Sequence, residues 1–367
     1  MTKNMKKILM SGNEACGEGA VIAGCKFYAG YPITPQNELI EYMARRMPEV
    51  GGVFIQSESE IAAINMVFGA SLVGERAMTS SSSPGISLKQ EGISYLAGCE
   101  LPAVIVNMMR GGPGLGNIAP AQSDYFQATK GGGHGDYHII VLGPSTVQEM
   151  LELTSLAFDL ADKYRMPSMI LGDGILGQMM EPVVIKSQVA SHKSQIKKTW
   201  ALTGCKGREP RIIRSLLLND GALEAFNNKL QAKYKVIKDK ETRYEAVNTA
   251  DAEIVLVGYG SVARILKSAA AKLRHKGIKA GLLRPITLWP FPEKALGEIA
   301  KKACPSGRRA KRFFVVEMSC GQMVEDVKLA VCGNAKVEFY GRPGGGIPSE
   351  EEIIKKVMTN EKAQNSK

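Results

Sequence analysis

Three segments of this 367-residue sequence place reactive side chains beside stiff or glycine-rich backbone. In YPITP at 31–35, two prolines stiffen the chain around Thr34. Glu60 begins an almost wholly apolar helical pattern, and Arg110 opens a loop that contains four glycines. A hydroxyl group, a carboxyl group shielded from water and a planar guanidinium fork are suited to proton transfer and to holding a carboxylate. These residue types therefore indicate chemistry on a small oxoacid.

Each of the three residues also has a purely structural interpretation. The YPITP segment is equally a rigid turn that leads into a helix at Gln36. Glu60 is equally a first-turn charge that complements the helix dipole. Arg110 is equally the start of an ordinary surface loop. Residue type and spacing leave both interpretations open at each position.

Two glycine motifs resemble nucleotide or diphosphate sites but are incomplete. The turn at 258–261 follows a strand, yet Ala263 stands where the dinucleotide fingerprint needs its third glycine, so we expect a structural turn. The tripeptide at 172–174 matches the start of the diphosphate–magnesium motif of thiamine enzymes. That motif needs an Asn about thirty residues downstream, and the first Asn here is Asn219. Asp173 is therefore predicted to be a turn or helix-cap residue, and no metal site is predicted in this chain.

Composition narrows the class of protein. Hydrophobic residues make up 44% and charged residues 23% of the chain, which is typical of globular proteins. No apolar run is long enough to span a membrane, so we expect a cytoplasmic protein without membrane contact. The seven cysteines include no Cys-x-x-Cys pair, which argues against zinc and against an iron–sulfur cluster held by this chain alone.

The positive charge of the chain is concentrated in its second half. Residues 1–185 carry 12 Lys/Arg against 18 Asp/Glu, and residues 186–367 carry 35 against 18. Such asymmetry is compatible with a nucleic-acid surface, an acidic partner, a phosphorylated ligand or a solvated basic face. The basic stretches lack the interleaved aromatic residues of a base-stacking platform, so we expect no nucleic-acid binding.

Alternating strand and helix patterns must position these side chains. The first half predicts strands at 27–28, 53–55, 77–79, 103–106, 139–141 and 168–171. Helical spacing is predicted at 34–47, 60–73, 87–98 and 147–164, the last preceded by the N-cap sequence Pro144-Ser145-Thr146. This order is typical of βα units on a parallel sheet, whose carboxyl ends bind ligands.

The pattern weakens after Pro182 and returns at Glu253. From there strands are predicted at 253–257, 278–283, 312–317 and 337–340, with helices at 262–276 and 292–303. The sequence therefore predicts a first α/β domain at 1–185, a basic connecting arm at 186–250 and a second α/β domain at 251–360.

The segments that carry the reactive side chains resemble one enzyme family. They are YPITPQ at 31–36, QSESEIAAINMVFGAS at 56–71, MTSSSSPGISLKQEGISYLAGCELPAVIVNMMRGGPG at 78–114 and PAQSDYFQATKGGGHGD at 120–136. Together they resemble the α-chain of the 2-oxoacid:ferredoxin oxidoreductases, most closely the 2-oxoisovalerate and 2-oxoglutarate types. The likeness continues over 250–350, where EIVLVGYGS, LLRPITLWPFP and FFVVEMSCGQM resemble the C-terminal region of transketolases.

The resemblance implies a fold class and a division of labour. The fold is α/β: a pyrimidine-binding thiamine diphosphate domain, a parallel sheet with helices on both faces, followed by a transketolase C-terminal-like domain. A β-chain would hold the diphosphate and Mg²⁺, while γ and ferredoxin-like δ chains of the hetero-oligomer would carry iron–sulfur clusters. The implied reaction converts a 2-oxoacid and coenzyme A to acyl-CoA and carbon dioxide, with electrons passing to ferredoxin.

The resemblance also assigns residues. In the family, the glutamate that contacts the aminopyrimidine ring lies nine residues before a Gly-Ala pair, which Gly69-Ala70 matches for Glu60 and disfavours for Glu58. Three further positions would contact the cofactor: Tyr31, Pro32 and Ile33. Substrate contacts would be made by Thr34, Arg110 and Gly111. Catalysis would involve Glu60, as the proton relay, together with Thr34 and Arg110.

Substrate choice and the enzyme class stay open at this level. Leu115 and Ile118 suggest an apolar wall, which favours 2-oxoisovalerate over 2-oxoglutarate, because the latter would need a second cation. A transketolase- or decarboxylase-type thiamine enzyme is the first alternative, and the missing metal motif argues against it. A basic nucleic-acid-binding protein is the second, supported by charge alone.

Overall fold

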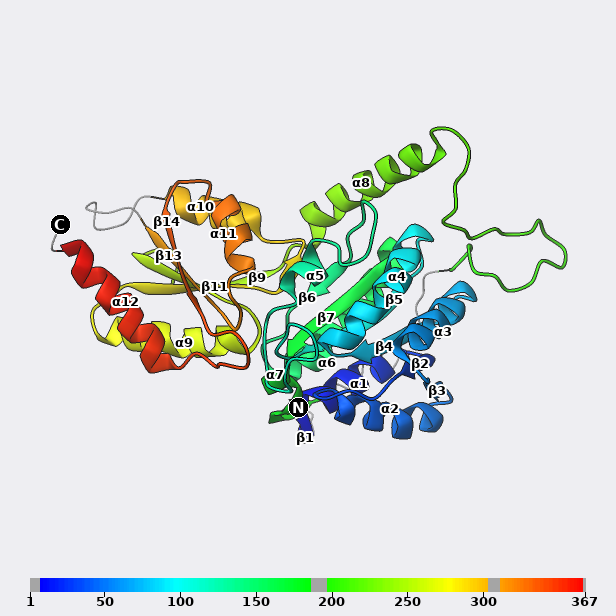
Figure 1. The fold of residues 1–367 in the computed structure, drawn as a ribbon, viewed down its shortest axis with the longest axis horizontal. Coiled ribbons are helices and arrows are strands. Elements are labelled where there is room, and N and C mark those ends of the chain that lie inside the picture. Colours follow the sequence, from blue (N-terminus) through cyan, green and yellow to red (C-terminus); the bar gives the residue numbers. More distant parts are fainter. Residues whose placement is uncertain (1–6, 186–196, 303–310, 366–367) are drawn as a thin grey trace, which may run out of the picture.

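Two largely parallel β-sheets, each flanked by helices, form the body of the chain (Figure 1). The structure is a computed structural model that describes residues 7–185, 197–302 and 311–365. Among these residues, no helix is long and apolar enough to cross a lipid bilayer. The expected α/β class is confirmed by the alternation of strands and helices along the chain.

The larger sheet has seven strands in the spatial order β12, β6, β7, β5, β4, β2, β3. Their bounds are β2 (Phe27–Gly30), β3 (Val53–Gln56), β4 (Ala77–Ser81), β5 (Ala103–Met109), β6 (Ile140–Leu142), β7 (Pro167–Asp173) and β12 (Thr287–Trp289). Only β12 runs antiparallel to its neighbour. Every residue of β4, β5 and β7 is buried, as expected for a parallel sheet covered on both faces. The six strands predicted in the first half are confirmed.

Seven helices accompany this sheet within the described residues. They are α1 (Gly12–Ile22), α2 (Asn37–Glu49), α3 (Glu60–Leu72), α4 (Ser83–Gly98), α5 (Tyr125–Thr129), α6 (Val147–Tyr164) and α7 (Gly174–Gln178). The prediction for α6 is confirmed residue for residue, and Thr146 Oγ1 accepts a hydrogen bond from the Glu149 amide at 3.1 Å as its N-cap. Helix α2 begins three residues later than predicted, because Pro35 disfavours helical backbone at the residue before it.

Helix α1 is not predicted from the sequence, since its three glycines lower helix propensity. The structure explains two of them by close packing: a Cβ on Gly19 would lie 2.4 Å from the Leu151 carbonyl oxygen of α6, and one on Gly12 would lie 1.9 Å from the Leu176 carbonyl oxygen of α7. Close approach to another helix therefore outweighs local propensity here.

The smaller sheet has five strands in the order β14, β13, β10, β11, β9. Their bounds are β9 (Tyr244–Val247), β10 (Ile254–Val257), β11 (Ala280–Pro285), β13 (Arg312–Glu317) and β14 (Lys336–Gly341). Its helices are α9 (Gly260–His275), α10 (Glu293–Lys301), α11 (Met323–Val331) and α12 (Glu350–Asn365). The four predicted strands are confirmed, and α9 lies within two residues of its predicted bounds. The predicted end of α10 at Ala303 lies outside the described residues.

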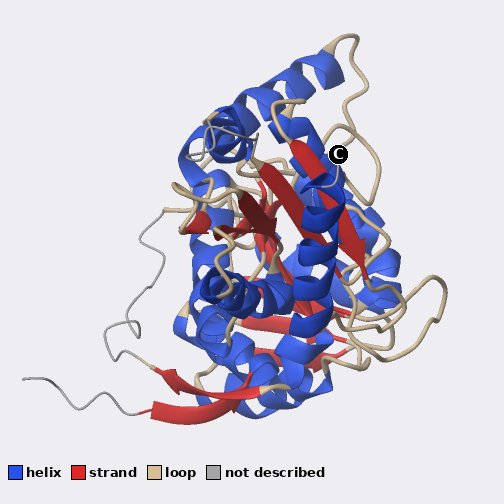
Figure 2. Ribbon diagram, turned by 90° about the vertical axis from the view of Figure 1, so that its left-hand side faces the viewer, coloured by secondary structure: helices blue, strands red, loops and turns tan. Residues whose placement is uncertain are grey.

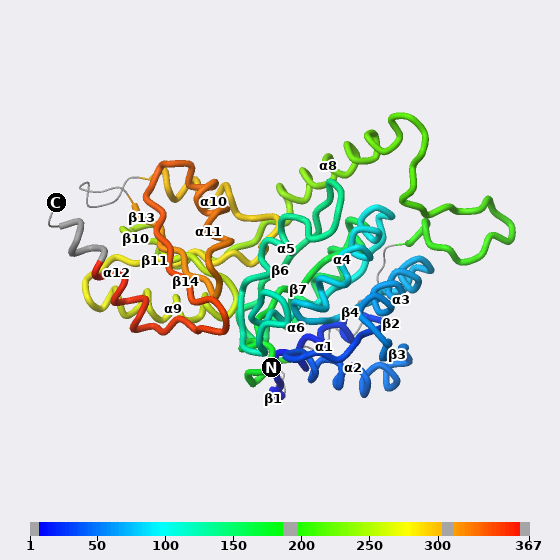
Figure 3. Tube along the Cα trace, viewed as in Figure 1, coloured from blue at the N-terminus to red at the C-terminus, as the bar shows by residue number. Residues whose placement is uncertain are grey.

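The region at 186–250 contains regular structure that the sequence pattern does not reveal. Helix α8 (Ala222–Glu241) precedes β9. It lies beside the domain that is built on the larger sheet, as the trace in Figure 3 shows. It buries Leu230, Tyr234 and Ile237 at helical spacing, while its many lysines stay at the surface. The narrow apolar stripe was hidden by the density of lysine, so the expectation of an irregular arm is wrong for this part. Residues 186–196 lie outside the described residues.

One strand crosses the expected division between the first body, built on the larger sheet, and the second body, built on the smaller sheet. Strand β12, which follows β11 in the chain, adds to the edge of the larger sheet. Strands β1 (Lys7–Ser11) and β8 (Met180–Val184) form a separate antiparallel ribbon, which projects at the lower left of Figure 2. The ribbon holds the start of the described chain beside the end of the first α/β unit.

Candidate active site at the carboxyl ends of four parallel strands

The four neighbouring strands β5, β4, β2 and β3 end at one edge of the larger sheet. Thr34 follows β2, Glu60 follows β3, Ser82 follows β4 and Arg110 follows β5. Parallel pairing therefore brings residues that are up to 76 positions apart to the same edge, where α/β sheets bind ligands. Thr34 and Arg110 touch directly, as described below.

Glu60 is the first residue of α3 and is 7% exposed. Ser59 Oγ caps the helix by accepting from the Ala62 amide at 3.1 Å. The carboxyl group lies against Gly85 of α4, where a Cβ would approach Glu60 Oε1 to 2.5 Å. Within the described residues, no donor is hydrogen-bonded to this carboxyl group. Glu58, its competitor, is exposed. The site thus contains a shielded acid with free acceptor oxygens.

Arg110 is 6% exposed and fixed by the chain around it. Its Nη1 donates to the Thr34 carbonyl oxygen and its Nη2 to the Leu115 carbonyl oxygen, both at 3.1 Å. Its Nε is buried without a hydrogen-bond partner. A buried donor without a partner is costly, so Nε is a candidate contact for a ligand.

The proline-stiffened turn lies beside Arg110. Tyr31 and Pro32 are exposed, and Ile33 and Thr34 are half-buried. The Thr34 hydroxyl accepts a long bond from Asn37 Nδ2 at 3.5 Å, which leaves its proton free to donate. The turn therefore presents a free hydroxyl donor next to the guanidinium group.

The loop after Arg110 is closed on itself. The Gly111 amide donates to the Ala119 carbonyl oxygen at 2.9 Å, so this N–H is already used within the loop. A Cβ on Gly111 would lie 2.5 Å from Asn117 Oδ1, which explains the glycine. Leu115 and Ile118 are 80% and 67% exposed, so in this chain neither encloses an apolar wall.

A group of serines at the end of β4 was not singled out from the sequence. The hydroxyl groups of Ser81 and Ser82 are buried without hydrogen-bond partners. Ser83 Oγ donates to Asp124 Oδ2 at 2.6 Å, and Asn107 Nδ2 donates to the same oxygen at 2.9 Å. Burial raises the pKa of Asp124, and these two bonds partly offset the shift. The run of four serines after a strand was the available signal.

Asp173 has the structural role predicted for it. Its Oδ1 accepts from the Leu176 amide at 3.1 Å and caps α7. Its Oδ2 accepts from the amide of Ser261 at 3.1 Å and from the Ser261 hydroxyl at 2.7 Å. Gly260 in the predicted glycine turn has a φ of +60°, and its close approach to this carboxylate explains the residue type. Both oxygens are therefore engaged within the chain.

Helix α3 is only half-buried, although its sequence is almost wholly apolar. Ile61 is 49% exposed at the start of the helix and Val73, just after its end, is 47% exposed, while the exposed Asn65 lies between them on the outward face. A Cβ on Gly69 would meet open space. The helix is largely apolar on both faces, so among the described residues an apolar surface next to Glu60 is left without cover.

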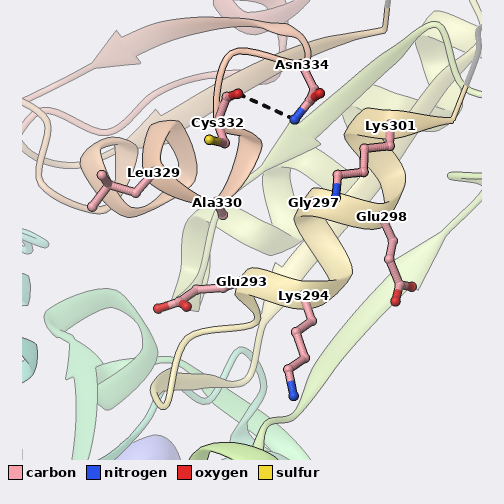
Figure 4. A pocket seen from close by; sticks show the side chains of 9 residues that line it. All are labelled: Glu293, Lys294, Gly297, Glu298, Lys301, Leu329, Ala330, Cys332 and Asn334. Atoms are coloured by element: carbon pink, nitrogen blue, oxygen red, sulfur yellow. Dashed lines mark hydrogen bonds between the residues drawn. The ribbon is translucent and has the colours of Figure 1, made fainter.

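A cavity on the second body does not resemble a catalytic site. It has a volume of about 650 Å³ and lies between α10 and α11 (Figure 4). Figure 4 shows that Glu293, Lys294 and Glu298 point in different directions, and Leu329 is 73% exposed. No convergent set of polar groups is assembled there, so the sheet edge is the better candidate.

The fold is that of a thiamine diphosphate-binding domain followed by a second α/β domain. Residues 18–251 match the family model "Pyruvate flavodoxin/ferredoxin oxidoreductase, thiamine diP-bdg", and residues 252–353 match "Pyruvate:ferredoxin oxidoreductase core domain II". The chain belongs to the pyruvate flavodoxin/ferredoxin oxidoreductase family. It is an α-type subunit of a 2-oxoacid:ferredoxin oxidoreductase, as the sequence predicted. Membership of this family argues against the second alternative, a basic nucleic-acid-binding protein.

Two relatives illustrate the likeness. The ketoisovalerate oxidoreductase subunit VorB of Methanothermobacter marburgensis is 51% identical over 349 residues, 95% of this chain and 96% of its own length. The 2-oxoglutarate synthase subunit KorA of Archaeoglobus fulgidus is 40% identical over 346 residues, 92% of this chain and 95% of its own.

Solved structures agree with the fold. A 2-oxoglutarate:ferredoxin oxidoreductase from Magnetococcus marinus, with 2-oxoglutarate, coenzyme A and succinyl-CoA bound, matches with a TM-score of 0.85 and 27% identity. The match covers 97% of this chain and 65% of that longer chain. A split-gene transketolase matches with a TM-score of 0.58 at 14% identity, which supports the transketolase-like fold alone.

Proposed function

We propose that Glu60 contacts the aminopyrimidine ring of thiamine diphosphate and relays protons to and from it. The observation that carries this proposal is the shielded Glu60 carboxyl group, which has no hydrogen-bond partner among the described residues at the ligand-binding edge of the sheet. The buried, unpartnered hydroxyls of Ser81 and Ser82 also fit a polar ligand at this position. Thiamine diphosphate, when bound, supplies the nucleophilic carbon for decarboxylation of a 2-oxoacid.

Glu60 would act at a ring nitrogen. Its carboxyl group would hold or release a proton at that nitrogen and so support the proton transfers that activate the bound cofactor. The Ser59 cap fixes the first turn of α3, and Gly85 allows α4 to approach the carboxyl group closely. These contacts hold the acid in position before the cofactor arrives.

Arg110 and Thr34 would hold the substrate. The free Nε of Arg110 is suited to the substrate carboxylate, while its two Nη groups keep the guanidinium in place. The free proton of the Thr34 hydroxyl would stabilise negative charge on the keto oxygen. Gly111 would contribute by shaping the loop, because its amide already bonds Ala119. Tyr31, Pro32 and Ile33 would line the cofactor side of the turn.

A β-chain would complete the site with the diphosphate and Mg²⁺. Asp173 does not serve as a magnesium ligand in this proposal, since both of its oxygens already accept hydrogen bonds from this chain. The exposed apolar face of α3 beside Glu60 is suited to a protein partner. Further γ and ferredoxin-like δ chains would carry the iron–sulfur clusters and pass electrons to ferredoxin.

The proposed substrate is 2-oxoisovalerate, with 2-oxoglutarate as the second choice. Identity to the ketoisovalerate subunit, at 51%, exceeds the 37–40% to the 2-oxoglutarate subunits. Coenzyme A, which is bound in the Magnetococcus enzyme, would accept the acyl group. We also propose a cytoplasmic location, because Cys16, Cys25 and Cys99 are free thiols, which persist in reducing compartments.

The test uses the complex assembled with its partner chains. Glu60→Gln is compared with Glu58→Gln, a matched change at the exposed neighbouring glutamate. We expect Glu60→Gln to slow hydrogen–deuterium exchange at the thiazolium carbon by about a hundredfold or more, and Glu58→Gln to leave it unchanged. An undiminished exchange rate in Glu60→Gln would show that another group activates the cofactor.

A further inference from the structure

Lys89 is a fully buried lysine beside the proposed catalytic acid. It lies in α4, is 0% exposed, and its Nζ donates to the backbone carbonyl oxygen of Glu60 at 3.2 Å. Long lysine side chains normally extend their ammonium group to water. Neither the structural interpretation of the sequence nor the proposed chemistry accounts for a lysine at this position.

The residues around Lys89 form a stripe on α4 that faces the first turn of α3. Gly85, four residues earlier, lies against the Glu60 carboxyl group, and a Cβ there would approach Oε1 to 2.5 Å. Gly92, three residues later, lies against Ile64, where a Cβ would approach the side chain to 2.6 Å. The two glycines bring the helices together, and the lysine between them reaches the start of α3.

This placement is costly for a cation. Burial lowers the pKa of Lys89 to about 7, and the charge of Glu60 partly offsets the shift. The N-terminus of α3 carries the positive end of the helix dipole, so it offers the ammonium group no help. An apolar side chain of similar length would fill the same space without this cost. A specific contribution to Glu60 is the simplest reason for the lysine.

We propose that Lys89 is a positioning residue that fixes the first turn of α3, so that the Glu60 carboxyl group faces the cofactor. The inference rests on the proposed role of Glu60. Lys89 touches neither the cofactor nor the substrate in this scheme; it acts through the Glu60 carbonyl group and through its charge. Its removal would leave the cofactor bound but let the acid leave its productive geometry.

The test compares Lys89→Met with Lys26→Met in the assembled complex. Lys26 is a matched control, because its Nζ also donates to a backbone carbonyl oxygen, that of Val50 at 3.0 Å, but at an exposed site. We expect Lys89→Met to slow thiazolium hydrogen–deuterium exchange per bound cofactor by about tenfold, and Lys26→Met to have no effect. Lys89→Gln, which keeps a shorter uncharged donor, should recover part of the rate.

Several outcomes separate the possibilities. A purely structural lysine would lower the yield of folded complex but leave exchange per bound cofactor within about twofold of the control, and this result overturns the inference. If Lys89→Met does not assemble, Lys89→Gln is judged by the same criterion. If Glu60→Gln fails to slow exchange, the proposed function fails first; if only Lys89→Met fails to slow it, the positioning role alone is lost.

Discussion

Two buried carboxylates at the ends of parallel strands have opposite surroundings in the two bodies. Glu317, the last residue of β13, is 0% exposed and accepts hydrogen bonds from the amides of Gln322, Met323 and Val324 and from the Ser319 hydroxyl. Glu60 is nearly as buried, yet its carboxyl group has no hydrogen-bond partner among the described residues.

The difference distinguishes a structural acid, Glu317, from Glu60, the acid that we propose acts on the cofactor. Glu317 satisfies the free amides at the start of α11, so the fold uses all of its acceptor capacity. Glu60 is held by the backbone at its helix start, and its oxygens stay available for a ligand. Burial alone therefore does not single out a candidate functional carboxylate, whereas burial combined with unused acceptor capacity does.

The largest expected effect is on turnover in Glu60→Gln. Loss of the proton relay should lower kcat by about a thousandfold, while the melting temperature of the complex stays within a few degrees of the wild type. Steady-state assays with 2-oxoisovalerate, coenzyme A and a viologen acceptor measure it. Normal turnover in Glu60→Gln would show that Glu60 is not the proton relay.

Glu317→Gln should show the converse pattern. Three helix amides lose a charged acceptor in a buried setting, so we expect the free energy of unfolding to fall by about 3 kcal/mol. Urea unfolding of the assembled protein measures this loss. Turnover per folded complex should stay near the wild-type value; a selective loss of turnover would mean that Glu317 also has a chemical role.

Arg110→Ala tests a second buried polar group, whose Nε has no hydrogen-bond partner within the described residues. Without the guanidinium, the substrate carboxylate loses its cation, so kcat/KM should fall by about a hundredfold. Arg110→Lys should recover little, because an ammonium group cannot keep the two Nη contacts and offer Nε at once. Unchanged kinetics in Arg110→Ala would exclude it from the pocket.

Because Lys89 is buried, we expect the free energy of unfolding to depend on pH. Burial lowers its pKa to about 7 in the folded chain from the ordinary lysine value of 10.5, so the unfolded state binds more protons between these two pH values. Stability of the wild type should therefore rise by up to about 2 kcal/mol between pH 7 and pH 9, and level off below pH 7. Urea unfolding at several pH values should show that Lys89→Met lacks this rise. An equal rise in both proteins would place its origin elsewhere.

The smallest effect is expected at Thr146, whose hydroxyl oxygen already accepts a hydrogen bond from the Glu149 amide. Thr146→Ala removes the N-cap of α6 and should cost about 1 kcal/mol of stability. Thermal unfolding measures it, and Thr146→Ser should restore most of the loss. A marked drop in turnover per folded complex would contradict the distinction between satisfied and available groups.

Sequence reasoning was most successful where local signals are strong. Buried apolar runs correctly predicted six strands of the larger sheet, all in the first half of the chain. The residue spacing and the N-cap of α6 predicted both ends of that helix. It was least successful for α1 and α8. Three glycines conceal the first, and a dense run of lysines conceals the apolar stripe of the second.

The sequence by itself determined the parallel sheet, the place of Glu60 at a helix start and the family. Only the tertiary structure decided that Asp173 accepts hydrogen bonds from Ser261 and that Lys89 reaches Glu60. It also decided that the outer face of α3 is left exposed by the part of the chain that the structure describes. The physical reason is the separation along the chain over which each kind of interaction acts. Strand and helix signals arise between neighbours in the chain, whereas the hydrogen-bond state of a buried polar group depends on partners that folding brings together from distant positions.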